Sequence, residues 1–498
     1  MPPGGRRLVP DLALAAAVFV TRIPFLAPGA GTDTDGWYLV GAAREMVATG
    51  RYTRSRFPGY PVQEWLCSLI ARAGGGAVAM NVLSALASAA CAFAFARVLG
   101  RLGVRDAALA ALALVFVPAA YVASVSCMDY LFALAFVLAA CHAMLRGRTL
   151  QAGLWLGLAI GSRLTSLVLI PPVALLPCVE TVPMRKSARR ALALLLPSAL
   201  LGAACYVPAY ARYGWGFLKF TDPLRTGSTP LDFVTGFLHI GQMPIPAALI
   251  VGQATALLWG VPGSAVLAAA GFRALVARLT ARRAPARAPV HASVPARVQL
   301  AAAVAIALEL LLYLRLPHDE GYLLPAVPFV LLLAASRLPR GWFRAVCAAA
   351  IVSPFILGVD VEPPKKGVPP LTRSPLAITR PAGGHRIVFE PLRGPLLRDH
   401  AKRVRARAIV DRVAAARATL PPGAFVLAGV LNAELEIRLP LGHGDRWYTD
   451  YVSEPDLRNL RAQGRDVLLL PAARERILQV AGYDPVAAGA RELFPDER

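Results

Sequence analysis

The sequence predicts an all-α polytopic membrane protein with about eleven transmembrane helices and a small C-terminal α/β domain that is extracytoplasmic. Three observations support this fold class. Of the 498 residues, 56% are apolar and 17% are charged, whereas about 25% of residues are charged in ordinary soluble domains. Mean hydropathy is +0.53. The apolar residues are concentrated before residue 360, in runs that approach the length needed to cross a bilayer. This composition excludes a simple soluble enzyme.

The balance of charged residues also changes near residue 360. There are 31 Lys and Arg against 13 Asp and Glu before residue 360, and 22 against 17 from there on. A pI near 10.5 is also typical of nucleic-acid binders. Here, however, the basic residues lie mainly between apolar runs, as they do in membrane proteins whose cytoplasmic loops retain Lys and Arg. Membrane lipids, and no nucleic acid, are therefore the expected partners of these residues.

Eleven apolar runs account for the expected helices. They are 9–28, 77–98, 108–125, 128–146, 150–162, 164–180, 191–210, 245–270, 298–316, 321–336 and 342–359. The fifth and sixth runs are short and are separated by Gly161-Ser162-Arg163-Leu164-Thr165, so they form either a bent pair or one long helix. Two helices are favoured, because an odd total number of spans then places every basic cluster on the cytoplasmic side of the membrane.

The charge bias also predicts the topology. Arg6 and Arg7 precede the first run, which we expect to be retained as a span because no small-residue cleavage site follows it. With the N-terminus in the cytoplasm, nine of the thirteen acids before residue 360 fall on the outer face. Acids gathered on one face suggest a functional site there. The expected location is the cytoplasmic (inner) membrane.

The C-terminal part has a different composition. Residues 360–385 are rich in Pro, Gly and basic residues and are expected to form an extended linker. The domain predicted at 386–498 combines helices at 399–419 and 454–463 with strand-like segments at 424–429 and 466–471. Parity places this domain outside, where it could cover the site. None of the seven cysteines lies in it, and no disulfide framework is implied.

The first outer loop, 28–63, is longer than a simple connection requires. Asp33 and Asp35 are candidate catalytic carboxylates. Together they could also hold a divalent cation such as Mg or Mn through their oxygens, or both could cap the amphipathic helix that follows. Trp37 and Tyr38 could stack on a sugar, although aromatic side chains also anchor proteins at membrane interfaces.

Several motifs together resemble the type C membrane glycosyltransferases, whose relatives include the protein O-mannosyltransferases and the bacterial lipid A aminoarabinose transferases. The resemblance covers about residues 8–359, the expected membrane domain within 1–359. It rests on Asp35-Gly36-Trp37-Tyr38, the segment 56–61 (Arg-Phe-Pro-Gly-Tyr-Pro), the broken pair around Arg163, and the segment 317–325 (Pro-His-Asp-Glu-Gly-Tyr-Leu-Leu-Pro) that opens a late span.

The resemblance implies a polyprenyl-phosphate sugar donor, an active site facing away from the cytoplasm, and a catalytic carboxylate at Asp35. The sequence departs from the family pattern at two places. Gly36 stands where a Glu is more usual, which puts metal use in doubt, and Gly321 stands where an Arg commonly precedes the Tyr. The phosphate ligand is then expected among Arg56, Arg163 and Arg315. Residues expected to orient or contact the sugar are His318, Asp319, Glu320 and Tyr322.

The expected activity is transfer of a hexosyl or pentosyl group from a polyprenyl phosphate to a glycan, lipid or protein acceptor. A transporter or flippase of a lipid-linked or small-molecule substrate is the alternative. Its ionisable groups should lie near the membrane midplane, and Glu309 alone among the acids lies well inside an apolar run. A non-catalytic scaffold that presents the C-terminal domain is a third class. An arginine such as Arg163 between apolar helices is also open to two interpretations, a phosphate ligand or a side chain that extends to the interface.

Overall fold

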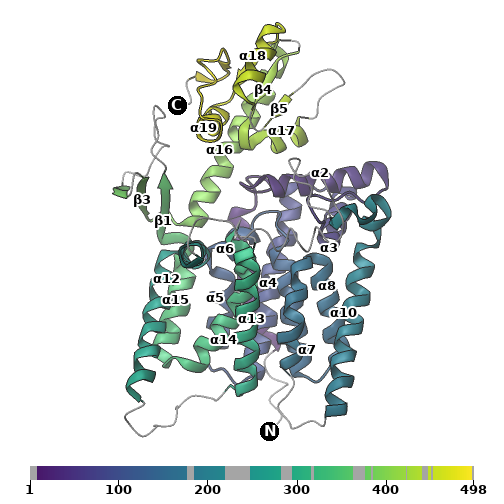
Figure 1. Ribbon diagram of the computed structural model, residues 1–498, viewed down its shortest axis with the longest axis vertical. Coiled ribbons are helices and arrows are strands. Elements are labelled where there is room, and N and C mark those ends of the chain that lie inside the picture. The colour runs from purple at the N-terminus through teal and green to yellow at the C-terminus, as the bar shows by residue number, and fades with distance from the viewer. Residues whose placement is uncertain are drawn as a thin grey trace.

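The computed structural model describes residues 8–176, 184–218, 247–281, 294–315, 319–362, 376–382, 385–421, 423–439, 447–449 and 452–495. An upright bundle of helices carries short helices and a separate small domain at one end (Figure 1). Of the expected site residues, His318 lies outside the described residues, as does the side chain of Arg315.

Each of the eleven predicted runs corresponds to one apolar helical segment. These segments are α1 (Leu8–Arg22), α4 (Ala77–Arg101), α5 (Ala107–Phe116) with α6 (Pro118–Ser124), α7 (Tyr130–Leu145), α8 (Thr149–Ser162), η2 (Leu164–Leu169) with α9 (Ile170–Leu175), α10 (Met184–Tyr213), α12 (Ala247–Ala281), α13 (Ala296–Arg315), η4 (Glu320–Ala326) with α14 (Val327–Arg337), and α15 (Arg340–Ile356). Among the described residues, six helices are long and apolar enough to cross a membrane on their own, or seven with the bent pair α5 and α6. The polytopic membrane fold is therefore confirmed.

The third span is bent where a single helix was expected. Pro118 follows Val117, whose extended backbone interrupts the helical hydrogen bonds, and α5 and α6 meet at 71°. Arg22, the last residue of α1, is fully buried at this bend. Its guanidinium donates to the carbonyl oxygen of Val115 at 2.5 Å and lies 4.1 Å from the ring centroid of Tyr121. No acidic side chain among the described residues pairs with it, so backbone carbonyls and aromatic faces stabilise this cation.

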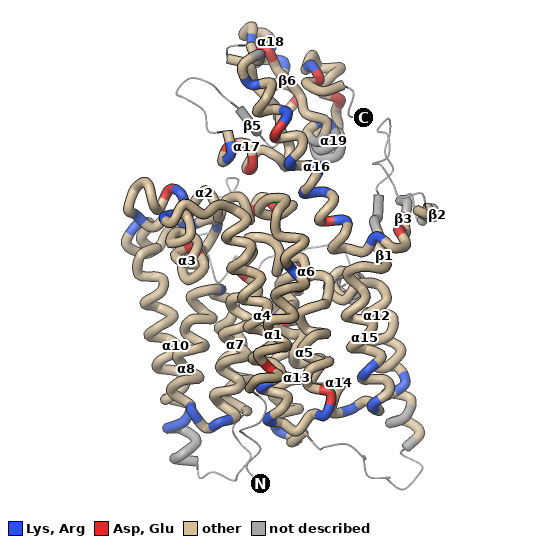
Figure 2. The backbone as a smooth tube through the Cα atoms, turned by 180° about the vertical axis from the view of Figure 1, so that it is seen from behind, with Lys and Arg blue, Asp and Glu red and all other residues tan. Residues whose placement is uncertain are grey.

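Short helices cover the end of the bundle that was predicted to face outward. α2 (Thr34–Thr49) and α3 (Pro61–Arg72) lie in and just after the first long loop, and η1 (Ile23–Phe25) and η3 (Gly214–Leu218) end neighbouring spans. Most of the Lys and Arg near the membrane lie at the opposite end of the bundle (Figure 2). The distribution agrees with the charge bias on which the topology prediction depends.

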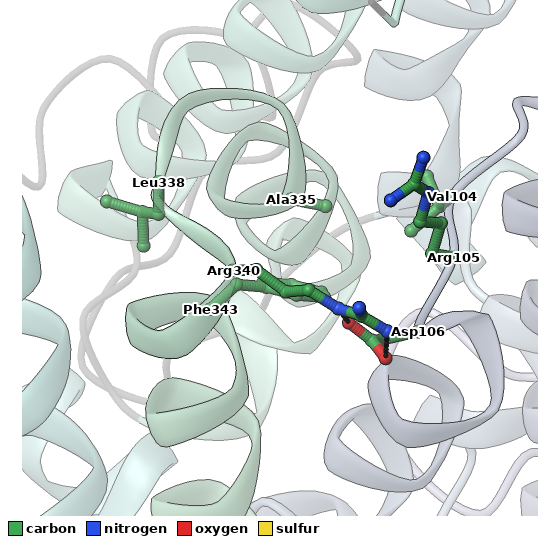
Figure 3. Close-up of a pocket in the computed structure, with 7 residues that line it drawn as sticks. All are labelled: Val104, Arg105, Asp106, Ala335, Leu338, Arg340 and Phe343. Atoms are coloured by element: carbon green, nitrogen blue, oxygen red, sulfur yellow. Dashed lines mark hydrogen bonds and ion pairs between the residues drawn. The ribbon is translucent and has the colours of Figure 1, made fainter. Parts of the chain in front are cut away.

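That opposite end carries a small pocket lined by Val104, Arg105, Asp106, Ala335, Leu338, Arg340 and Phe343 (Figure 3). It is partly open to solvent, and its water-accessible volume is about 40 Å³. Asp106 accepts two hydrogen bonds from Arg340, at 2.9 and 3.1 Å, and one from Arg344. The pocket is too small for a sugar and is a structural junction between α5 and α15.

The last span leads directly into a strand instead of an extended linker. β1 (Leu357–Glu362), β2 (Ile378–Ala382) and β3 (His385–Pro391) form an antiparallel sheet in the order β1-β3-β2. Leu357 is paired with Pro391 and Ile378 with Phe389. Both ends of the segment 360–385 therefore belong to this sheet.

A parallel α/β unit follows. α16 (Pro395–Ala416) leads away from the membrane part, and the parallel strands have the order β5-β4-β6-β7. The strands are β4 (Phe425–Leu427), β5 (Trp447–Thr449), β6 (Val467–Leu469) and β7 (Arg491–Glu492), and the remaining helices are η5 (Arg417–Thr419), η6 (Gly429–Leu431), α17 (Asn432–Arg438), α18 (Glu454–Ala462) and α19 (Pro471–Val480). The domain has its own buried cluster, which includes Val410, Val426 and Leu468. The small C-terminal α/β domain is thus present, next to α2 (Figure 1).

Candidate active site

The two aspartates of the first outer loop have different roles. Asp33 is the N-cap of α2, and its Oδ1 accepts a hydrogen bond from the backbone N–H of Asp35 at 3.0 Å. Asp35 lies in the first turn of the same helix, and its Oδ2 is 2.9 Å from Nη1 of Arg56. The capping role thus belongs to Asp33, while the carboxylate of Asp35 faces a cation.

Asp35 begins a row of four alternating charges. Arg56 forms a second ion pair with Oδ1 of Asp129, and Oδ2 of Asp129 is 2.6 Å from Nη1 of Arg163. The exposed fraction of the side chain falls along the row, from 34% at Asp35 and 17% at Arg56 to 1% at Asp129 and 4% at Arg163. The row therefore runs from the open surface of the site into the protein, with Asp35 as the member that a solvent-borne molecule reaches first.

Arg163 points into the protein and not toward the membrane interface. α8 ends at Ser162, and the backbone of Arg163 is extended, with φ −160°, before η2 begins. The guanidinium carbon lies 4.2 Å from the ring centroid of Tyr130 and 4.3 Å from that of Tyr322. Both aromatic faces and Asp129 fix the orientation of this cation. Of the predicted site residues, Asp35, Arg56, Arg163 and Tyr322 are thus brought together.

The segment before Tyr322 closes the site from the other side. Asp319 is the N-cap of η4, where its Oδ1 accepts a hydrogen bond from the N–H of Gly321 at 2.8 Å, and its Oδ2 accepts one from the hydroxyl of Tyr130. Glu320 is half-buried beside it. Asp319 therefore has a structural role at the start of η4, whereas no ion pair with another described residue engages the carboxylate of Glu320.

Steric contacts explain both departures from the family pattern. A Cβ atom at Gly36 would lie 2.6 Å from the carbonyl oxygen of Ala30, so no side chain fits there. A Cβ atom at Gly321 would lie 2.7 Å from the ring of Tyr130. The positions where the family more usually has a Glu and an Arg are filled by neighbouring atoms. Arg163, held against the same Tyr130, supplies a guanidinium nearby.

The acids around Asp35 do not fit a divalent cation well. Asp33 has one oxygen bound to the helix N-terminus, one oxygen of Asp35 is paired with Arg56, and Gly36 offers no ligand. Within the described part of the chain, no group of three or more His, Cys, Asp or Glu side chains could hold a metal ion.

A buried carboxylate supports the loop that carries Arg56. Glu64 of α3 is fully buried and accepts hydrogen bonds from the N–H of Ser55 at 2.6 Å, from the N–H of Tyr60 at 3.0 Å and from the hydroxyl of Tyr52. The guanidinium of Arg56 lies 4.4 Å from the ring centroid of Tyr60. The loop 52–60 is thus folded around Glu64, and this fixes where Arg56 is presented.

Asp129 stands at the N-terminus of α7, where an aspartate can either cap the helix or face the site. It makes no side-chain cap hydrogen bond, and both its oxygens pair with arginines. The supporting roles of Tyr130 and Glu64 were missed, because neither residue stands in a motif. The one sequence feature that indicated such a role was the position of Glu64 beside an apolar run, because a buried carboxylate is costly unless it is paired.

The two candidate aromatic residues differ in their exposure to solvent. Trp37 is buried, with its ring against Gly29 and in a cluster with Met80, Cys127 and Ala433. Tyr38 is 40% exposed. Of the pair, Tyr38 is the side chain that a sugar could reach.

Burial raises the pKa of Asp35, because the charged form loses hydration. Arg56 opposes this shift, while the neighbouring Asp33, Asp129 and Asp319 add to it. A carboxylate with a raised pKa is a stronger base than an ordinary aspartate. The arrangement can accept a proton at Asp35 and bind an anion through buried guanidinium groups.

No protein-family model matches the sequence, and no curated protein matches it. Among solved structures, ArnT from Cupriavidus metallidurans bound to undecaprenyl phosphate matches with 14% identity over 98% of this chain and 90% of that chain, at a TM-score of 0.52. The same protein in the apo state matches with 14% identity over 96% of each chain, at a TM-score of 0.44. The first comparison shows that the two chains share a fold.

Proposed function

We propose that this protein is a membrane glycosyltransferase that moves a sugar from a polyprenyl-phosphate donor to an acceptor at the outer face of the cytoplasmic membrane. The observation that carries the proposal is the row Asp35, Arg56, Asp129 and Arg163, in which a half-buried base is followed by a half-buried and then a buried guanidinium. It lies at the end of a bundle whose fold is that of a protein bound to undecaprenyl phosphate. Glycan, lipid and protein acceptors all remain compatible with it.

In the proposed reaction Asp35 removes the proton from an acceptor hydroxyl, whose oxygen forms a bond to the anomeric carbon of the sugar. The bond from that carbon to the phosphate oxygen breaks, and the electron pair leaves with the polyprenyl phosphate. Arg56 and Arg163 stabilise the charge on the leaving phosphate, to which guanidinium groups bind well. A base and a cation site are sufficient, so the mechanism needs nothing that the described residues do not provide.

One observation favours the alternative of a transporter or flippase. Glu309 is buried in α13, and no hydrogen bond or ion pair engages it among the described residues. Acids within membrane helices often mark ion pathways. Asp129 and Arg163 of the candidate site, however, stand at helix ends and not in the middle of a span, where a transport site is expected.

A transfer assay tests the proposal. The purified protein in lipid nanodiscs is incubated with a set of radiolabelled polyprenyl-phosphate sugars and an envelope lipid and glycan extract. Transfer of label from one donor, with release of polyprenyl phosphate, supports the proposed function. A protein that transfers none of the donors but moves a labelled substrate across proteoliposome membranes would be a transporter instead.

The proposed topology predicts a labelling pattern. Cysteines introduced at the exposed Thr49 of α2 and Arg458 of α18 should react with a membrane-impermeant maleimide in intact cells stripped of their outer layers. Cysteines at the exposed Arg148 and Arg190 should react only after lysis. The described native cysteines are buried or half-buried, which keeps the background low. The opposite pattern would place the site in the cytoplasm and contradict the proposal.

The base role predicts the pH dependence. Because burial raises the pKa of Asp35 above its ordinary value of 3.8, and because only the ionised form accepts a proton, kcat/KM should fall as the pH drops through that raised pKa. Arg56 lowers the same pKa, so Arg56→Gln should move the acid limb of the profile to still higher pH. An acid limb unchanged by Arg56→Gln would show that another group is titrating.

A further inference from the structure

A buried ion pair in the C-terminal domain lies against the loops of the membrane part. On α16, Nε of Arg403 is 2.8 Å from Oδ2 of Asp399, and the side chain of Arg403 is 1% exposed. An ion pair taken out of water in this way loses much of its hydration, so it adds little to stability unless its geometry is used. Its contacts beyond α16 are therefore informative.

Each member of the pair binds a different loop. Oδ1 of Asp399 accepts a hydrogen bond from the hydroxyl of Thr32 at 2.8 Å. Nη1 of Arg403 donates to the carbonyl oxygen of Val125 at 2.8 Å. The two loops also meet directly, because the N–H of Cys127 donates to the carbonyl oxygen of Ala30 at 2.7 Å. The ion pair thus joins the segment around Thr32 to the segment around Val125.

These two segments carry the two carboxylates that Arg56 bridges. Thr32 precedes Asp35 by three residues, and Val125 precedes Asp129 by four. A shift of one loop relative to the other would move Asp35 away from Asp129 and pull Arg56 from one of its partners. A misplacement of about 1 Å in a catalytic group commonly costs about 100-fold in rate.

We infer that Asp399 and Arg403 are positioning residues that set the separation of Asp35 and Asp129, so that the C-terminal domain is a working part of the site and not only a cover over it. This inference rests on the proposed function for its catalytic consequence. The structural part stands by itself, because the contacts of the pair with both loops are independent of any reaction.

Other contacts hold the domain in place when the pair is removed. Arg44 of α2 donates to the carbonyl oxygen of Ile437 at 2.7 Å, and Arg407 donates to that of Ala27 at 3.1 Å. Ala433 of α17 packs in the cluster around Trp37. A variant that replaces both charges of the pair by apolar side chains of similar size should therefore still fold and keep the domain docked.

The test uses the full chain in nanodiscs with the double variant Asp399→Leu, Arg403→Met. Its matched control is Glu454→Leu, Arg458→Met, which removes an ion pair of the same spacing on the exposed α18 of the same domain. Two quantities are measured: hydrogen exchange of peptides covering 29–36 and 125–130, and kcat and KM for a labelled polyprenyl-phosphate sugar. A second pair of variants tests the hydroxyl that donates a hydrogen bond to Asp399. Thr32→Val removes this hydroxyl, and Thr32→Ser keeps it.

We expect the double variant to exchange faster by at least about tenfold in both peptides and to lose about 10- to 100-fold in kcat, with the donor KM changed by less than about twofold. Thr32→Val should show a smaller loss in kcat than the double variant. Thr32→Ser and the control variant should keep the kcat of the wild type. Unchanged exchange and kcat in the double variant, or a change in KM alone, would overturn the inference. If the wild type transfers no sugar, the proposed function fails, and the exchange data alone then decide whether the pair orders the two loops.

Discussion

Asp35→Asn should lower kcat for glycosyl transfer by at least about 100-fold, because a positioned general base contributes about 10² to 10⁴ in rate and an amide cannot take the proton. The change is nearly isosteric, and the capping hydrogen bond of α2 comes from Asp33, which is left intact. Expression and thermal stability should therefore stay near those of the wild type. The measurement is the initial transfer rate of purified variants under saturating donor.

Asp33→Asn is the matched control for this prediction. Asparagine caps helices about as well as aspartate, so this variant should keep most of the activity if Asp33 only caps α2. Equal and near wild-type rates for both variants would remove the first outer loop from the mechanism. If both variants failed together and chelation also abolished transfer, a metal bridging the two carboxylates would be the better explanation.

The second large effect is expected on stability. Asp129→Asn leaves the buried Arg163 without a carboxylate partner among the described residues and leaves Arg56 with Asp35 alone. Breaking a buried ion pair from one side costs about 3–5 kcal/mol, because a charge remains buried without compensation. We expect a clear fall in the midpoint of thermal unfolding in detergent, together with the loss of transfer activity.

Asp106→Asn provides an unusually close control for Asp129→Asn. Asp106 also bridges two arginines, at 2.9 Å from each, but Arg340 and Arg344 are 43% and 51% exposed. Exposed ion pairs contribute about 0–1 kcal/mol, so this variant should unfold close to the wild-type temperature. Similar losses in the two variants would mean that burial of the Asp129 pairs does not carry the stability assigned to it.

Much of the fold could be predicted, because apolar run length and charge bias act locally along the chain. All eleven runs correspond to helical segments, including the break at Arg163, and the two strand-like segments of the C-terminal domain correspond to β4 and β6. The bend at Pro118 was not anticipated, because the run 108–125 was interpreted as one helix although a proline stands inside it. β1 was missed because it pairs with residues of β3 that lie about thirty positions later in the chain. β2 was missed because it lies in a Pro-rich segment.

The site was predictable only in part. Asp35, Arg56 and Arg163 stand in motifs, so their side chains drew attention as charges in unusual places. What connects them is Asp129, 73 residues from Arg56 and 34 from Arg163. Glu64 likewise acts through hydrogen bonds to a loop whose shape the sequence does not reveal. Partners that meet only after the helices pack leave no regular spacing by which to recognise them.

The burial of Arg22 has a consequence for how the chain is made. α1 is synthesised before α5, yet the carbonyl oxygen that accepts a hydrogen bond from the guanidinium of Arg22 belongs to Val115, 93 residues later. Until α5 and α6 are inserted, Arg22 lacks the carbonyl oxygen and the aromatic ring that stabilise its charge, and a charged side chain within a membrane helix is costly. We therefore expect the position of α1 in the bilayer to become stable only when the third span packs beside it.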